Sequence, residues 1–147
     1  MADPLSIVAS SIAIISFGLS TCNGLMNYYD AWKAFDEQIA NAFAKIESLA
    51  STLKTLQELL NKLSYDPNPA AKDVGRSIIA CYGGMQKLQK KLEKFRTNPL
   101  PKDIKMKFRK IGLRTWYPFQ KDTLKELLNT VKDLYTGLSG ALHVLEM

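Results

Sequence analysis

The sequence has few of the residues that catalytic and metal sites need. Its 147 residues include one histidine, His143, and two cysteines, Cys22 and Cys81. Zinc sites combine several cysteine or histidine ligands, so a histidine-based metal cluster is excluded. There is no glycine-rich phosphate loop, no nucleophile elbow and no HExxH helix, and the carboxylates stand singly among lysines. We therefore expect no enzymatic activity, no cofactor and no bound metal.

Charge is also missing from one long stretch near the N-terminus. The 26 residues from Pro4 to Tyr29 are all uncharged, and Asp3 and Asp30 stand at the two ends. Asp3 followed by Pro4 favours a helix start, because the carboxylate accepts from free backbone N–H groups and proline has no N–H to satisfy. Such a helix is roughly 39 Å long at 1.5 Å per residue, which exceeds the ~30 Å hydrocarbon core of a bilayer.

The pattern within this stretch predicts a helix with two different faces. Apolar residues recur three and four positions apart on one face: Leu5, Val8, Ile12, Ile15, Leu19, Cys22 and Met26. Small uncharged residues follow on another face: Ser6, Ser10, Ala13, Ser16, Ser20, Asn23 and Asn27. Three interpretations stay open, namely a central bundle helix, a permanent membrane anchor, and a helix that rests in a bundle and acts at a membrane. A secretory signal peptide is not expected, because residues 1–3 lack basic character.

Hydrophobic spacing predicts helices at about 4–30, 36–63, 70–95, 102–114 and 119–145, and no segment shows convincing strand alternation. We predict an all-α fold, an antiparallel bundle of four long helices with one additional short helix, forming a single domain over residues 1–147. The pair Gly83-Gly84 predicts a kink or a close helix crossing within the third helix. Cys22 and Cys81 lie in apolar helical settings, so we expect free thiols in a reducing compartment.

Positive charge gathers in one segment of this basic chain, whose formal net charge is +6. Eleven basic residues and two acidic ones lie between residues 87 and 114, whereas the rest of the chain has more acidic than basic residues. The basic residues are Lys87, Lys90, Lys91, Lys94, Arg96, Lys102, Lys105, Lys107, Arg109, Lys110 and Arg114. A solvated face, an anionic lipid surface, nucleic acid and an acidic protein remain open as interpretations. Nucleic acid is not the expected partner, because the aromatic residues are not interleaved with the basic run.

Three stretches resemble one protein family. The opening Ala2-Asp3-Pro4-Leu5-Ser6-Ile7-Val8-Ala9-Ser10-Ser11-Ile12-Ala13 looks like the start of the fungal N-terminal domain of STAND proteins, the HeLo-like domain. Ala80-Cys81 with Leu88-Gln89-Lys90-Lys91-Leu92-Glu93 resembles the third helix of that family. Trp116-Tyr117-Pro118-Phe119-Gln120-Lys121, followed by Leu124, Leu127 and Leu128, resembles its aromatic corner and last helix. The resemblance covers nearly the whole chain.

The resemblance implies a cytosolic helical bundle at the N-terminus of a fungal NOD-like receptor. Such domains are regarded as cell-death effectors in fungal innate immunity and heterokaryon incompatibility. They are akin to the HeLo domain and to the bundle of mixed-lineage kinase-domain-like protein. In that picture oligomerisation exposes the first helix, which then attacks the plasma membrane as a pore-forming element. The nucleotide-binding receptor module is not present in these 147 residues, so we expect an excised module or a short stand-alone version.

These observations together predict a non-enzymatic effector domain that moves from the cytoplasm to an anionic membrane and self-associates. The residues expected to insert are Leu5, Ile7, Val8, Ile12, Ile14, Ile15, Phe17 and Leu19, and the eleven basic residues are expected to bind anionic lipid. The alternative is an adaptor that binds another protein, or copies of itself, without touching lipid.

Overall fold

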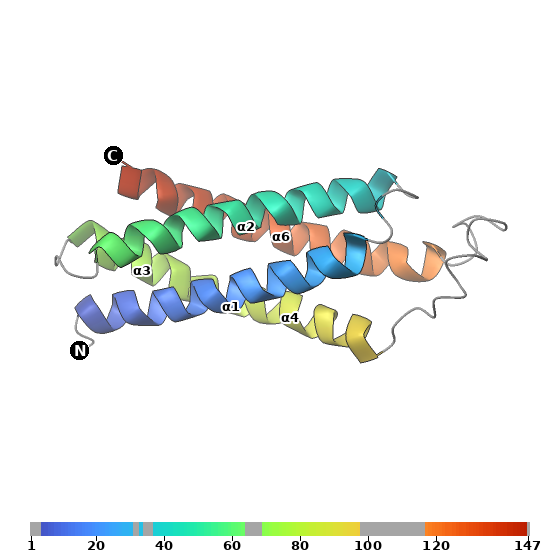
Figure 1. Ribbon diagram of the computed structural model, residues 1–147, viewed down its shortest axis with the longest axis horizontal. Helices are drawn as coiled ribbons and strands as arrows, with labels where there is room; N and C mark the ends of the chain where they lie inside the picture. The colour runs from blue at the N-terminus through green and yellow to red at the C-terminus, as the bar shows by residue number, and fades with distance from the viewer. Residues whose placement is uncertain (1–3, 31–32, 34–36, 64–68, 98–116, 147) are drawn as a thin grey trace.

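The computed structural model describes residues 4–30, 33, 37–63, 69–97 and 117–146, and every regular element within those ranges is an α-helix (Figure 1). The predicted all-α fold is thereby confirmed at the level of its elements. The helices are α1 (Pro4–Asp30), α2 (Glu37–Leu63), α3 (Pro69–Ala80), α4 (Tyr82–Thr97) and α6 (Tyr117–Glu146).

Most predicted boundaries agree with the observed ones to within two residues. α1 begins at Pro4, where proline lacks only a hydrogen bond that the first turn could not make. The last helix begins at Tyr117, two residues before the predicted start, with Pro118 in its first turn. The predicted short helix at 102–114 lies outside the described residues.

The third predicted helix is in fact two helices that meet at Cys81. The Cys81 N–H donates to the carbonyl of Ile78 at 2.9 Å, which is a three-residue turn instead of an α-helical bond. The Cys81 carbonyl then accepts from the N–H of Met85 at 3.2 Å, which restarts regular helix. Gly84 marks a close crossing as well, since an added Cβ would lie 2.8 Å from a methyl of Leu134 on α6. Both features expected of the glycine region therefore occur, with the break two residues before Gly83.

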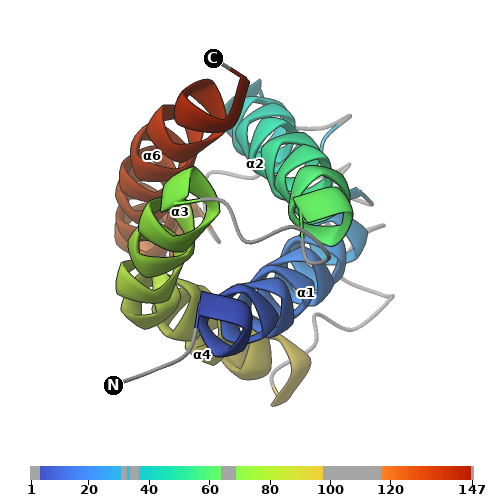
Figure 2. The same ribbon diagram turned by 90° about the vertical axis from the view of Figure 1, so that its left-hand side faces the viewer.

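The helices lie alongside one another, and α3 and α4 follow each other along one side (Figure 1). α1 packs on α2, α3 and α4, and α6 packs on the same three helices from the other side. α1 and α6 consequently stand at opposite corners when the molecule is viewed from its end (Figure 2). The largest fully buried side chains come from all five helices: Ile15, Leu25, Ile46, Leu49, Leu53, Leu56, Leu60, Ile78, Met85, Leu88, Leu92 and Leu127.

Lys33 connects the end of α1 to the start of α2. Its ammonium group lies 2.9 Å from a carboxylate oxygen of Asp30 and 4.3 Å from the centre of the Phe43 ring. A cation above an aromatic ring is attracted by the negative face of the ring. Lys33 thus contacts both the last residue of α1 and Phe43 of α2.

Candidate functional site

The uncharged helix α1 is built into the core through a face that overlaps the predicted apolar stripe at Val8, Ile15 and Cys22. Of the residues expected to insert, Ile7, Val8 and Ile15 are buried, whereas Ile12, Ile14, Phe17 and Leu19 are only partly buried. The side chain of Leu5 lies outside the described residues. The observed buried stripe is Val8, Ser11, Ile15, Gly18, Cys22, Leu25 and Tyr29. The predicted stripe is correct at Val8, Ile15 and Cys22. Ile12, Leu19 and Met26 are partly buried against the core, and the buried positions next to them are Ser11, Gly18 and Leu25.

Local hydrogen bonds explain why polar residues can lie on the buried face of α1. The hydroxyl of Ser11 is fully buried and donates to the carbonyl of Val8 at 2.8 Å. The hydroxyl of Thr21 lies 3.0 Å from the carbonyl of Phe17 and 2.8 Å from the side-chain oxygen of Gln89 on α4. A buried hydroxyl is tolerated when such a partner replaces water. A rule based on hydrophobicity alone places these residues outside the core.

Two glycines bring the backbone of α1 close to its neighbours. A Cβ added to Gly18 would lie 3.0 Å from the sulfur of Met85 and 3.2 Å from a methyl of Leu53. A Cβ added to Gly75 on α3 would lie 2.8 Å from the Cγ2 methyl of Ile7. The absent side chains allow contacts that larger residues would prevent. In this state α1 is packed into the bundle along one face.

The other face of α1 is exposed and carries no charge before Asp30. Its exposed residues include Ser10, Ala13, Ser16, Ser20, Asn23 and Asn27, as the spacing of the small polar residues predicts. Ser16 accepts a hydrogen bond from the side-chain amide of Gln57 on α2 at 2.9 Å. Among the described helices, α1 alone is long and apolar enough to cross a membrane, over Ile7–Asp30. Buried core helices of soluble proteins can have the same length and apolar composition.

Four of the predicted basic residues line one groove between α4 and α6, which we call the α4/α6 groove. They are Lys87, Lys90, Lys91 and Lys94, and the described lining is completed by Glu126, Asn129 and Thr130 of α6 around a hollow of about 400 Å³. Positions 87, 90, 91 and 94 share one face of a helix, so α4 turns all four toward α6. The side chain of Arg96 and the residues Lys102, Lys105, Lys107, Arg109, Lys110 and Arg114 lie outside the described residues.

One ion pair crosses the α4/α6 groove. The Lys91 ammonium lies 2.8 Å from a carboxylate oxygen of Glu126, and Lys91 is the less exposed partner, at 16% against 69%. The hydrogen bond and the charge of Lys91, with a contribution from Lys94, lower the pKa of Glu126. Thr130, which also lines the groove, donates its hydroxyl proton to the carbonyl of Glu126 at 3.0 Å. Glu126 is the one acidic residue against four lysines in the described lining.

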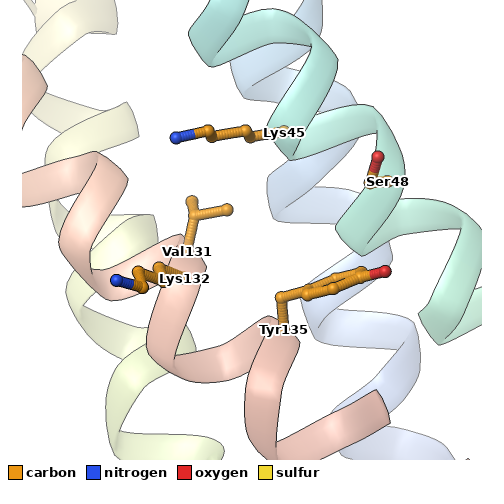
Figure 3. A pocket seen from close by; sticks show the side chains of 5 residues that line it. All are labelled: Lys45, Ser48, Val131, Lys132 and Tyr135. Carbon is orange, nitrogen blue, oxygen red and sulfur yellow. The ribbon is translucent and has the colours of Figure 1, made fainter.

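A second lysine-lined surface lies on the other side of α6, and the sequence analysis missed it. Between α2 and α6 lie two adjoining hollows of about 380 and 360 Å³, both lined by Lys45 and Lys132, which we call the α2/α6 groove. Figure 3 shows Lys45 and Lys132 extending their ammonium groups toward the same side, with Val131 between them and the Tyr135 ring reaching toward α2. Lys125 lines the second hollow, and no carboxylate is among the described lining residues.

Lys45, Lys125 and Lys132 come from two helices that are far apart in the sequence, and each helix also carries acidic residues. Lys45 belongs to α2, whereas Lys125 and Lys132 belong to α6, about 80 residues later. Only the pairing of α2 with α6 brings them together. A count of charge along the chain cannot find such a surface, because the relevant neighbours are close in space and remote in sequence.

The two cysteines are free thiols, as predicted. Burial raises the pKa of the Cys22 thiol to about 12 and also raises the pKa of Cys81, which is half-buried at the α3–α4 junction. Both thiols are therefore neutral at physiological pH and poor nucleophiles. Within the described part of the chain no group of three or more potential metal-binding side chains comes together.

Comparison with known proteins gives one distant relative. The chain is 27% identical, over 143 residues, to a protein from Monascus ruber named azaphilone pigments biosynthesis cluster protein L. The aligned region is 96% of this chain and 30% of the relative, so the chain spans less than a third of the length of that protein. This similarity suggests a fungal origin. The chain matches no protein-family model and no solved structure.

Proposed function

We propose that this chain is a HeLo-like effector domain, an antiparallel helical bundle that binds anionic membranes through lysines and acts on them with α1. The observation that carries the proposal is the α4/α6 groove, where four lysines face one carboxylate on a bundle that also holds an uncharged helix. The fungal relative agrees with the fungal family that the sequence resembles. Self-association and a downstream receptor module belong to the same proposal.

The charge of the groove suits a lipid surface. Each lysine near an anionic membrane contributes ~1 kcal/mol, so a few lysines acting together hold a small domain there. Lysine is a compact charge on a flexible stem and does not require the fixed geometry that a bidentate arginine demands. Lysine can therefore follow phosphate headgroups that move within the bilayer surface. We accordingly place the protein in the cytoplasm at rest and at the inner face of the plasma membrane when active.

The contacts of α1 define what activation must change. Ile15, Cys22 and Leu25 are almost completely buried, so α1 cannot offer its apolar face to lipid while it packs in the bundle. We propose that α1 detaches from α2, α3 and α4 before it enters the bilayer. The glycine contacts at Gly18 and Gly75 give α1 a close but uncharged interface that contains no ion pair among the described residues.

A flotation experiment tests the lipid-binding part. Lys87→Gln/Lys90→Gln should bind vesicles of phosphatidylcholine and phosphatidylserine roughly 30-fold more weakly than the wild type, at ~1 kcal/mol for each lysine. The control Lys54→Gln/Lys62→Gln removes the same charge from exposed positions of α2 that line neither groove, and it should bind nearly as the wild type does. Binding should fall with added salt. Equal binding to vesicles of phosphatidylcholine alone would contradict the proposal.

A permeabilisation experiment tests the role of α1. Ser10 and Ser20 are exposed, so Ser10→Glu/Ser20→Glu should fold normally and bind vesicles. Ser20 lies near the middle of the Ile7–Asp30 span, where a charged residue costs ~2.5–3.5 kcal/mol, so the variant should fail to release vesicle contents. Ser10→Gln/Ser20→Gln is the matched control, with similar volume and no charge. Wild-type leakage from the Glu variant would show that α1 does not insert.

The second candidate is an adaptor, and one observation favours it. Ile79 and Tyr82, on either side of the α3–α4 break, are large apolar residues with 39% of their surface exposed. Exposed aromatic and aliphatic side chains are frequent anchors of protein interfaces. An adaptor predicts that Ile79→Ser abolishes self-association or partner binding while vesicle binding is absent from the start. Flotation of the wild-type protein with anionic vesicles therefore separates the two candidates.

A further inference from the structure

The two grooves form one continuous surface that crosses α6. Asn129 lines the α4/α6 groove and also the nearer hollow of the α2/α6 groove. Along α6 the surface runs from Leu124 to Tyr135, which is roughly 17 Å of helix at 1.5 Å per residue. α6 thus forms a ridge with a lysine-lined groove on each side.

The charge of this surface is nearly all positive. Seven lysines line the three hollows, and Glu126 is the one acidic residue among their described lining. We call this set the lysine belt: Lys45, Lys87, Lys90, Lys91, Lys94, Lys125 and Lys132. It draws on α2, α4 and α6, and none of the described lining residues belongs to α1.

α1 occupies the opposite corner of the bundle. Figure 2 shows α1 and α6 on opposite sides, with α2 on one flank and α3 and α4 on the other. The exposed face of α1 carries only small uncharged residues before Asp30, so it offers nothing that attracts an anionic surface. The basic face and the uncharged helix therefore point in different directions.

We propose that the bundle docks on an anionic bilayer with α6 toward the lipid and α1 on the far side. The inference rests on the proposed function and adds an orientation to it. Lysine stems are long and flexible enough for the lysines on both sides of the α6 ridge to reach one plane, where a laterally continuous layer of phosphate groups would contact all seven. A small anion held in one groove contacts only the lysines of that groove.

This orientation makes docking and insertion separate steps. Because α1 faces away from the lipid, docking leaves its contacts with Leu53, Gly75 and Met85 unchanged. α1 reaches the bilayer only after it leaves the bundle. A protein whose α1 is held in place should therefore bind anionic vesicles fully and permeabilise none of them.

The first experiment tests two of the three belt lysines that the sequence did not predict. Lys45→Gln/Lys132→Gln should weaken binding to phosphatidylcholine–phosphatidylserine vesicles roughly 30-fold, as the double lysine variant on α4 does. The control Lys54→Gln/Lys62→Gln has the same net charge and should bind at least tenfold more tightly than the belt variant. If the two variants bind equally, membrane binding stands and the docking face is wrong. If wild-type protein does not bind these vesicles, the proposed function fails and the orientation fails with it.

The second experiment locks α1. In Ile7→Cys/Gly75→Cys the new sulfur at residue 7 replaces a group 2.8 Å from the Cβ position of residue 75, so a disulfide between α1 and α3 is geometrically suitable. Gly137→Cys is the matched lock, because its Cβ would lie 3.5 Å from the sulfur of Cys81 and the bond joins α6 to the α3–α4 junction. The α1 lock should bind vesicles with wild-type affinity and release no contents until it is reduced. Leakage from the oxidised α1 lock, with leakage unchanged in the matched lock, would overturn the separation of the two steps.

Fluorescent labels on the α1-locked protein read the orientation directly. Asn129→Cys places a label on the α6 ridge and Ser20→Cys places one on the exposed face of α1, both in a Cys81→Ala background. Burial keeps the native Cys22 thiol neutral, so labelling at neutral pH selects the introduced cysteine. A quencher on the lipid headgroup should quench the label at 129 and leave the label at 20 bright. The reverse result would place α1 toward the lipid and overturn the proposal.

Discussion

α1 can be recognised from one continuous stretch of sequence, whereas the lysine belt can be recognised only from the tertiary fold. α1 is a continuous stretch of sequence whose missing charge is visible to inspection, although its packing depends on contacts with α2, α3 and α4. The belt exists only after α2, α4 and α6 have come together, and three of its seven lysines come from helices that carry no basic excess. The comparison teaches that a buried helix can be recognised from its own residues, whereas a charged surface of a bundle depends on helix pairing.

The largest expected contrast is in thiol chemistry. Cys22 of α1 is 1% exposed and has a pKa of about 12, where 9.0 is ordinary, so at pH 8 roughly a thousandfold less thiolate is present. Cys81, at the α3–α4 junction, is only half-buried. We expect N-ethylmaleimide to modify Cys81 first and Cys22 only after unfolding in urea, as followed by mass spectrometry.

The pH dependence of this contrast has a definite sign. Because burial raises the pKa of Cys22, its contribution to stability is complete below pH 9 and is lost as the pH rises through 9 toward 12. Tyr28, whose pKa burial raises to about 12, acts in the same direction. Equal modification rates of Cys22 and Cys81 in the native protein at pH 8 would mean that α1 opens often. α1 would then not be a stably buried helix, and its contrast with the exposed lysine belt would fail.

The next contrast separates the predicted and observed faces of α1. Leu25 is fully buried, whereas Leu19, which the apolar spacing selects, is only partly buried. Leu25→Ala should lower the free energy of unfolding by about 2–5 kcal/mol, and Leu19→Ala should lower it by distinctly less. Urea denaturation measures both. A larger loss from Leu19→Ala would restore the stripe predicted from spacing.

Smaller effects are expected at two glycines, one at the α1 interface and one on α6. A methyl added at Gly75 meets Cγ2 of Ile7 at 2.8 Å, so Gly75→Ala should destabilise by about 1–3 kcal/mol. Gly140 has no atom within 4 Å of an added Cβ, so Gly140→Ala should stabilise by about 0.5–1 kcal/mol through helix propensity. Thermal melts of both variants check the pair. Stabilisation by Gly75→Ala would show that α3 and α1 are not in close contact.

Sequence periodicity predicted the helices well because each helix buries a repeating stripe. The stripe of α6 contains Leu124, Leu127, Val131, Leu134 and Leu138, all of which are buried as the three-and-four spacing requires. Periodicity did less well on α1, where the apolar residues are too numerous for spacing alone to select a face. There the buried positions include Ser11 and Gly18, chosen by a local hydrogen bond and by close packing. Neither signal is a matter of hydrophobicity.

The break at Cys81 and the α2/α6 groove show what a single sequence cannot supply. The glycine pair pointed to an irregularity, but it did not predict that the break would fall at Cys81, two residues before Gly83. Lys87, Lys90, Lys91 and Lys94 were predicted as a patch because they share a helix. Lys45 and Lys132 were not, because only the tertiary fold makes them neighbours.

The smallest expected effect concerns Glu126, the single carboxylate in the described lining of the belt. Glu126→Gln removes a negative charge beside Lys91 and should tighten binding to anionic vesicles, with little change in stability because the ion pair is exposed to solvent. Glu58→Gln, on an exposed position of α2 away from the belt, should leave binding nearly unchanged.

The lowered pKa of Glu126 means that its carboxylate, and the pair with Lys91, are lost only as the pH falls through that lowered value. The affinity difference between Glu126→Gln and wild type should therefore be present at pH 7 and close in acid, where wild-type Glu126 is protonated too. Flotation across a pH series measures the ratio of affinities at each pH, in which titration of the lipid itself cancels. A variant that binds more weakly than wild type at pH 7 would mean that Glu126 orders Lys91 for lipid instead of competing with it, and the belt would then work through its arrangement more than through its charge.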